Sequence, residues 1–119
     1  MADFGLFIGF GFPVRGREQK AAQVFQEAVT YFTRLQQKEQ LIERFDAVFL
    51  EPHGGDLGGF FLIWGEQDKI AQVRASEELL RLNTRASLIV ENYGVVGAET
   101  GARIETQMGL FLEASGELA

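Results

Sequence analysis

The chain has 119 residues, 46% of them hydrophobic, and a chain of this length buries about two-thirds of its unfolded surface, so we expect one globular domain over residues 1–119. It contains no cysteine, which excludes disulfides, thiolate chemistry and cysteine-based metal sites. The net charge of −6 argues against nucleic acid as a partner, because such binding depends on lysine and arginine side chains that neutralise phosphates.

The N-terminal residues, MADF, do not form a basic segment followed by an apolar one, as a signal peptide would. No apolar run approaches the ~18 residues that a membrane-spanning helix needs. We therefore expect a cytoplasmic protein with neither a signal peptide nor a membrane partner.

The first expected element is a strand over residues 4–12, FGLFIGFGF, with no polar side chain between Asp3 and Arg15. Such a strand is covered on both faces, since a face in contact with water would show alternating polar residues. One face carries bulky side chains, and the other carries Gly5, Phe7, Gly9 and Gly11. The glycine face could admit a closely packed helix or line a cavity, and we favour helix packing.

A helix is expected next, over residues 17–38, because apolar side chains recur there at helical spacing and polar ones cover the rest. Two strands follow, over residues 45–51 and 60–65, with the sequences FDAVFLE and FFLIWG. The loop between them, residues 52–59, contains four glycines and a proline. The two strands therefore form a hairpin with a long tip.

The second half of the chain begins with a helical pattern over residues 68–75 and 76–86, which predicts one bent helix or two short ones. Ser76 is the expected N-cap of the second part, because two acidic residues follow it directly. We expect a fourth strand over residues 88–99 and a C-terminal helix over residues 101–114.

The element order is β–α–β–β–α–β followed by a helix, which is the ferredoxin-like, split βαβ arrangement. We predict an α+β fold with a four-stranded antiparallel sheet. Right-handed crossovers place the first and third strands in the centre and the other two at the edges. Charged residues that discourage further strand pairing agree with this placement, because they lie in or beside the two edge strands. These residues are Asp46, Glu51, Glu91 and Glu99.

The sheet is expected to be apolar on both faces, but the two crossover helices cover only one of them. An uncovered face of this kind exceeds the apolar patch that a monomer usually exposes. The C-terminal helix, residues 101–114, is too short to span four strands easily. A second copy of the chain is the simpler cover, which predicts a homodimer.

The element order and the segments FGLFIGFGF, FFLIWGE and DKIAQVRASEELLRLNTRASLIV resemble the dimeric α+β barrel superfamily, in which two ferredoxin-like sheets face each other. The resemblance covers most of the chain and implies this architecture. It selects no single function, because the superfamily holds monooxygenases, haem-handling proteins, isomerases, peroxidases, ligand-binding modules and many uncharacterised members.

His53 is the only histidine, and it lies near Glu51 and Asp56 in the glycine-rich loop. Three such side chains could hold a divalent ion. The loop is expected to be flexible, however, and Pro52 fixes the geometry between two of the three residues. We therefore expect a solvated or hydrogen-bonded loop histidine, with no metal site and no cofactor. A Ser–His–Asp triad is not expected either, because the candidate serines lie on or near helices.

Four polar-tipped side chains could reach a cavity, namely Tyr31, Trp64, Asn92 and Tyr93. Tryptophan and tyrosine combine an apolar body with one hydrogen-bonding group, which suits an aromatic or polycyclic ligand, but we favour Trp64 as a core residue and Tyr31 at the rim of the helix stripe. Glu66 is the best candidate for a general base if the protein is an enzyme, and otherwise it is the first charge after a strand.

Two functions stay open. The first is a homodimer that binds a small, mostly apolar molecule between sheet and helices, with or without cofactor-free catalysis of the monooxygenase or isomerase kind. The second is a non-catalytic interaction or regulatory module with a fully packed, phenylalanine-rich interior. The small number of acid–base groups favours the second, and a cavity of several hundred Å³ with convergent polar groups would favour the first.

Overall fold

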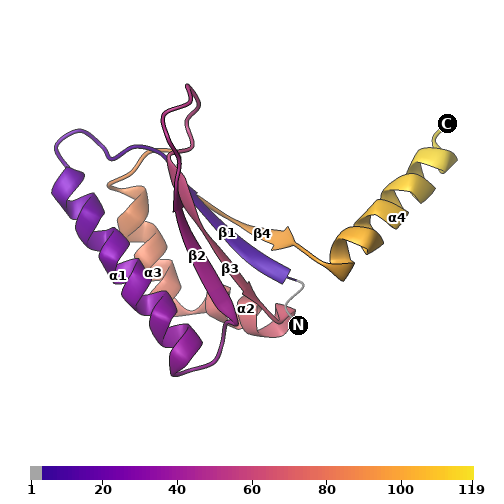
Figure 1. Ribbon diagram of the computed structural model, residues 1–119, viewed down its shortest axis with the longest axis horizontal. Coiled ribbons are helices and arrows are strands. Elements are labelled where there is room, and N and C mark those ends of the chain that lie inside the picture. The colour runs from indigo at the N-terminus through magenta and orange to yellow at the C-terminus, as the bar shows by residue number, and fades with distance from the viewer. Residues whose placement is uncertain (1–3) are drawn as a thin grey trace.

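Four segments rich in apolar residues pair into one antiparallel sheet with helices on one of its faces (Figure 1). The computed structural model describes residues 4–119. The elements are β1 (Phe4–Phe10), α1 (Glu18–Gln37), β2 (Arg44–Phe49), β3 (Gly59–Gly65), α2 (Gln67–Ala75), α3 (Glu77–Ser87), β4 (Gly94–Glu99) and α4 (Ala102–Glu117). The strand order β2-β3-β1-β4 confirms the expected ferredoxin-like α+β fold, with β1 and β3 in the centre.

The strand register decides which side chains share a face. On the face that α1, α2 and α3 cover, Leu6 lies opposite Ile63 and Ile8 lies opposite Phe61. All four side chains are buried, and they form the main core together with Phe32 of α1. On the opposite face, which we call the open face, the side chains of the two central strands are Phe7, Phe60, Leu62 and Trp64, beside Gly5 and Gly9.

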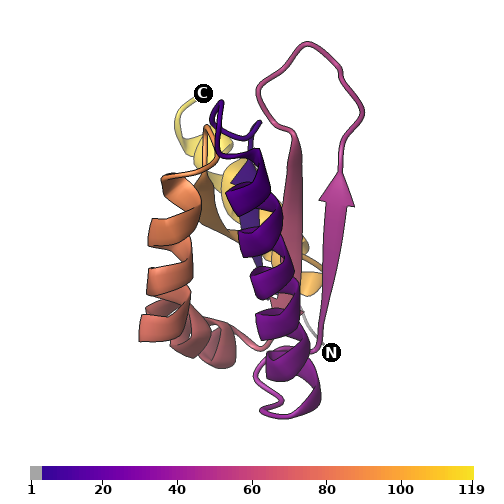
Figure 2. The same ribbon diagram turned by 90° about the vertical axis from the view of Figure 1, so that its left-hand side faces the viewer.

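The helices lie side by side on the covered face, α1 next to α3, as Figure 2 shows. The segment between α2 and α3 bends at Ser76, whose extended backbone (ψ 144°) interrupts the helical hydrogen bonding. Its side chain accepts a hydrogen bond from the Leu79 N–H over 3.2 Å. The expected N-cap is therefore confirmed, and the chain forms two short helices rather than one bent helix.

The fourth strand begins at Gly94, later than the predicted start at Leu88. The preceding segment does not join the sheet ladder because it pairs with the connection that follows β1, through a bridge between Pro13 and Val90. Asn92 then turns the chain with a positive φ of 55°, and β4 begins two residues later. For the same reason β1 ends at Phe10, before the predicted position 12.

The glycine face of β1 does not pack against a helix, so this expectation was wrong. It forms part of the open face: an added Cβ at Gly5 would meet β3 and β4, and one at Gly9 would meet Phe7 of the same strand and Leu57 of the loop after β2. A Cβ at Gly9 would lie 2.7 Å from the ring of Phe7. The bare glycine therefore gives the Phe7 ring room to lie beside Phe60, with their centroids 5.1 Å apart.

The C-terminal helix α4 projects away from the sheet at the end of β4 (Figure 1). It gives the molecule a longest dimension of 52 Å and a radius of gyration of 16.3 Å. A compact domain of this length has a radius of gyration of about 13.5 Å. Within residues 4–119, no helix combines the length and the apolar character needed to cross a membrane.

Candidate functional site

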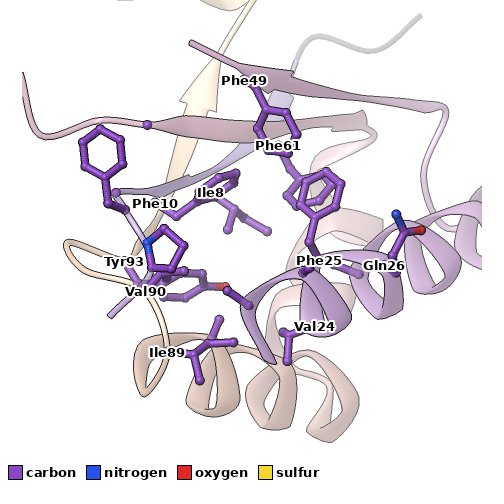
Figure 3. A pocket seen from close by; sticks show the side chains of 18 of the residues that line it. Ile8, Phe10, Val24, Phe25, Gln26, Phe49, Phe61, Ile89, Val90 and Tyr93 are labelled. Carbon is purple, nitrogen blue, oxygen red and sulfur yellow. The ribbon is translucent and has the colours of Figure 1, made fainter. Parts of the chain in front are cut away.

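A cavity of about 510 Å³ lies between the covered face of the sheet and the helices α1 and α3 (Figure 3). Its size falls within the range of roughly 300–1,000 Å³ that is typical of small-molecule sites. Its lining is almost entirely apolar. The phenylalanine-rich interior is therefore not fully packed, in contrast to the interior expected for an interaction module.

Phenylalanine rings form one wall of the cavity. Phe25 of α1 lies 5.1 Å from Phe61 of β3 and 4.9 Å from Phe49 of β2, between ring centroids. Phe10 of β1 completes the wall with its ring 6.2 Å from that of Phe61. The wall forms because Phe10, Phe49 and Phe61 lie at covered-face positions of three neighbouring strands.

The facing wall is aliphatic and belongs to a second, smaller group of buried residues. This group consists of Val24 in α1, Ala86 in α3 and Ile89 after α3. Ile8 and Phe61, on the sheet side, belong to the main core instead. The cavity thus lies between two parts of the hydrophobic core that would otherwise pack against each other.

The mouth of the cavity is rimmed by apolar side chains that water reaches. Phe12, Phe49 and Leu50 all line the cavity, and they are 58%, 69% and 36% exposed. They come from the connection after β1 and from the end of β2. An apolar rim that leads into an apolar cavity suits the entry of an apolar molecule.

Tyr93 supplies the main hydrogen-bonding group in the cavity wall. Its hydroxyl donates to Asn83 Oδ1 over 2.5 Å. Burial raises the pKa of Tyr93 to about 12, because the phenolate would lose hydration. The group is therefore a neutral phenol at pH 7, and its oxygen can still accept a hydrogen bond. The other polar lining residues, Glu18 and Gln26, are exposed on α1.

The structure does not bring the predicted ligand-binding residues together. Tyr93 lines the cavity, and Asn92 is an exposed turn residue beside it. Tyr31 is buried in the main core, where its hydroxyl lies 3.3 Å from Ser76 Oγ. Trp64 lies on the open face, and Glu66 is an exposed residue at the start of α2.

The sequence analysis missed the phenylalanines that line the cavity and the hydrogen-bond partner of Tyr93. The phenylalanines Phe10, Phe25, Phe49 and Phe61 have a spacing that suits a core, and spacing alone does not distinguish a packed core from a hollow one. Asn83 was missed because its partner Tyr93 is ten residues away and reaches it only after the turn at Asn92.

The ring of His53 is used within the loop that joins β2 and β3. Its Nδ1 accepts a hydrogen bond from the Gly55 N–H over 3.2 Å, so the proton lies on Nε2, which donates to the Leu57 carbonyl over 2.8 Å. The described part of the chain contains no cluster of three histidine, aspartate or glutamate side chains arranged to hold a metal ion.

No protein-family model and no curated protein sequence matches the chain. Solved structures match it by shape. A dimeric protein of unknown function with a ferredoxin-like fold from Bacteroides fragilis has a TM-score of 0.56 at 13% identity, over 81% of this chain and 95% of that one. A dimeric ferredoxin-like protein of unknown function from Jannaschia has a TM-score of 0.60 at 12% identity, over 82% of this chain and 98% of that one.

A third similar structure is SnoaB, a cofactor-independent oxygenase from Streptomyces nogalater. Its TM-score is 0.53 at 17% identity, over 84% of this chain and 97% of that one. At these identities the similarity shows the fold. The chain therefore shares the ferredoxin-like α+β fold of these structures.

Proposed function

We propose that this protein binds a small, predominantly apolar molecule in the cavity between the sheet and the helices. The observation that carries the proposal is the cavity of about 510 Å³, with its wall of phenylalanine rings and its apolar mouth. An unfilled cavity forgoes the dispersion contacts that its walls would make in a packed core. A bound apolar ligand would restore those contacts, so its binding would stabilise the folded chain.

The polar groups of the cavity support binding rather than acid–base catalysis. Tyr93 is held as a phenol, and the two other polar lining residues are exposed on α1. A ligand hydroxyl or N–H can donate to the Tyr93 oxygen, because the hydroxyl hydrogen already bonds to Asn83. We therefore expect a ligand with a large apolar body and one hydrogen-bond donor that reaches Tyr93.

A thermal-shift experiment with naphthalene and 2-naphthol tests this proposal. These compounds share an aromatic body, and only 2-naphthol carries a hydroxyl. Both should raise the melting temperature of the protein, and a ligand at 100 times its Kd stabilises by about 2.7 kcal/mol. Unchanged melting temperatures up to the solubility limits of these and larger aromatic compounds would contradict the proposal.

A second candidate function is cofactor-independent oxygenation of a ligand held in the same cavity, which the structural similarity to SnoaB favours. In such a reaction the substrate itself supplies the electrons that reduce dioxygen. The test is dioxygen consumption, measured with an oxygen electrode, after addition of compounds that raise the melting temperature. Uptake that depends on both protein and compound would favour the oxygenase, and binding without uptake would favour the binding protein.

We also propose that the chain forms a homodimer through the open faces of two sheets. The apolar residues of this face support the proposal, and so do the dimeric proteins among the similar structures. Sedimentation at micromolar concentration should give a particle of twice the chain mass of 13.3 kDa. A stable particle of the single-chain mass would contradict the dimer.

A further inference from the structure

The C-terminal helix α4 carries an apolar stripe that buries nothing within its own chain. Ile104, Met108 and Phe111 follow one another at helical spacing, and Leu112 lies beside them. Each of these four side chains is at least half exposed, and no residue of α4 is buried. A helix in a soluble protein normally turns such a stripe toward a core, so the stripe of α4 requires a partner surface.

Contacts of Arg103 hold the first turn of α4 against the end of the sheet. From this point the helix, with its apolar stripe, extends away from the sheet. Arg103 bonds to Glu99 of β4 over 3.3 Å and to Gln67 of α2 over 3.2 Å. Its guanidinium carbon also lies 5.6 Å from the centre of the Phe4 ring. These contacts join α4 to three other elements, and from there the helix extends away from the sheet (Figure 1).

The lengths of the matched regions indicate that α4 is an addition to the fold shared with the similar structures. Residues 4–99, from the start of β1 to the end of β4, are 96 of the 119 residues, or 81%. The three structures match 81–84% of this chain but 95–98% of their own chains. Residues 4–99 are therefore enough to account for the matched part of this chain. We infer that the three similar structures lack a counterpart of α4, so its role is specific to this chain.

The open face alone is too small for a standard protein–protein interface, and the stripe of α4 supplies the missing area. Four strands about 4.8 Å apart and about six residues long give a face of roughly 400 Å². A standard protein–protein interface takes about 800 Å² from each partner. The stripe of α4, 16 residues long at about 1.5 Å per residue and ~10 Å wide, offers roughly 240 Å². A subunit that both gives and receives such a helix adds roughly 480 Å², which reaches the standard size.

We infer that α4 is a dimerisation arm, which packs its apolar stripe against a second copy of this chain. Each subunit gives one arm and receives one, as two-fold symmetry requires. The inference rests on the proposed homodimer, and it adds the arm contact to the contact between the two open faces. The partner is a second copy because the open face alone falls short of a standard interface, and the arm contact, made outside the open face, supplies the missing area.

The first experiment compares two variants of the full chain. Met108→Glu with Phe111→Glu places two charges on the stripe, and Thr106→Glu with Gly109→Glu places the same two charges, at the same spacing, on the other side of α4. All four positions are exposed, so both variants should fold like the wild type. Sedimentation velocity over a dilution series, with circular dichroism as a check on folding, measures the dimer dissociation constant.

The stripe variant should raise this dissociation constant at least about 30-fold, which is the effect of losing one strongly contributing interface residue. The control variant should change it by less than about threefold, as expected for charges outside an interface. If the wild type is a dimer and both variants have its dissociation constant, the role of α4 as an arm is overturned, while the contact between the open faces still stands. A wild-type chain that stays monomeric would overturn the arm and the dimer together.

A second experiment distinguishes packing on the partner from packing on the same chain. The chain has no cysteine, so Ser115→Cys, at a small residue of the stripe, gives one attachment point for a benzophenone photo-crosslinker. Light and isotopically labelled chains are mixed, allowed to exchange and irradiated, and the cross-linked peptides are identified by mass spectrometry. Cross-links between light and labelled peptides are expected, whereas cross-links only within one chain would overturn the inference.

Discussion

Tyr93 and Asn83 form a hydrogen bond of 2.5 Å that joins the segment before β4 to α3 at the wall of the cavity. Both side chains are partly buried, and the bond links residues ten positions apart on two sides of a turn. It fixes the phenol ring where the main core and the smaller group of buried residues meet. The pair therefore fixes the position of the main polar group in the cavity wall.

The first prediction concerns the pH dependence that Tyr93 gives to stability. Burial raises its pKa in the folded chain to about 12, above the value of 10.0 for an unperturbed tyrosine. The stabilising effect is therefore complete below pH 10 and is lost as the pH rises from about 10 to 12, since the unfolded chain loses this proton first. Because the group keeps some exposure, we expect a loss of about 1–2 kcal/mol rather than the full value of the shift.

Tyr93→Phe isolates this effect, because phenylalanine does not ionise. The free energy of unfolding of the wild type minus that of the variant, measured in urea, should fall by about 1–2 kcal/mol between pH 9 and pH 12 and so reach zero or become negative. At neutral pH the variant should be less stable by about 1 kcal/mol, the contribution of a typical hydrogen bond. A difference that stays constant across this pH range would show that Tyr93 ionises equally in both states.

The second prediction tests the cavity by filling it. Ala86 lines the cavity from α3, and Ala86→Phe places a ring inside it. The variant should keep or exceed the wild-type stability, because the added ring occupies empty space instead of displacing packed side chains. The melting-temperature shift caused by naphthalene should disappear. Ala71→Phe, on the exposed side of α2, is the matched control and should keep the ligand shift.

The sequence was sufficient to predict the fold because the relevant interactions are local or periodic. The continuous apolar runs of β1 and β3, the charges at the edge strands and the cap at Ser76 all act over a few residues. The late start of β4 was missed because it depends on the bridge between Pro13 and Val90, which lie far apart in the chain. Such pairing leaves no periodic signal in either segment.

The cavity could be anticipated only as a possibility. Binding between sheet and helices was one of two functions that stayed open, but the residues that line the cavity were interpreted as core. Whether Val24 of α1 and Ile8 of β1 touch or leave a gap depends on the spacing of α1 and α3 over the sheet, which the sequence pattern does not specify. Trp64 and Tyr31 were chosen by residue type, and the register and the helix stripe direct them elsewhere.

The third prediction concerns the cap between α2 and α3. Ser76 Oγ accepts from the Leu79 N–H and also donates to the Val73 carbonyl over 2.7 Å. Ser76→Ala should lower the free energy of unfolding by about 1–2 kcal/mol, because the first turn of α3 loses its cap and the Tyr31 hydroxyl loses a neighbour. Ser87→Ala, at the exposed end of the same helix, should change it by less than about 0.5 kcal/mol. Equal effects in chemical denaturation would contradict the role of the cap.

The fourth prediction concerns two glycines that lie directly opposite each other on the open face. A Cβ at Gly9 would lie 2.7 Å from the Phe7 ring, whereas a Cβ at Gly94 would meet no atom within 4 Å. Gly9→Ala should cost about 1 kcal/mol, because the Phe7 ring must leave its place beside Phe60. Gly94→Ala should be neutral or stabilising, by up to about 1 kcal/mol, since it only restricts the unfolded chain. Urea denaturation of the two variants measures the difference, and a Gly9→Ala protein as stable as Gly94→Ala would show that the Phe7 ring does not need the space.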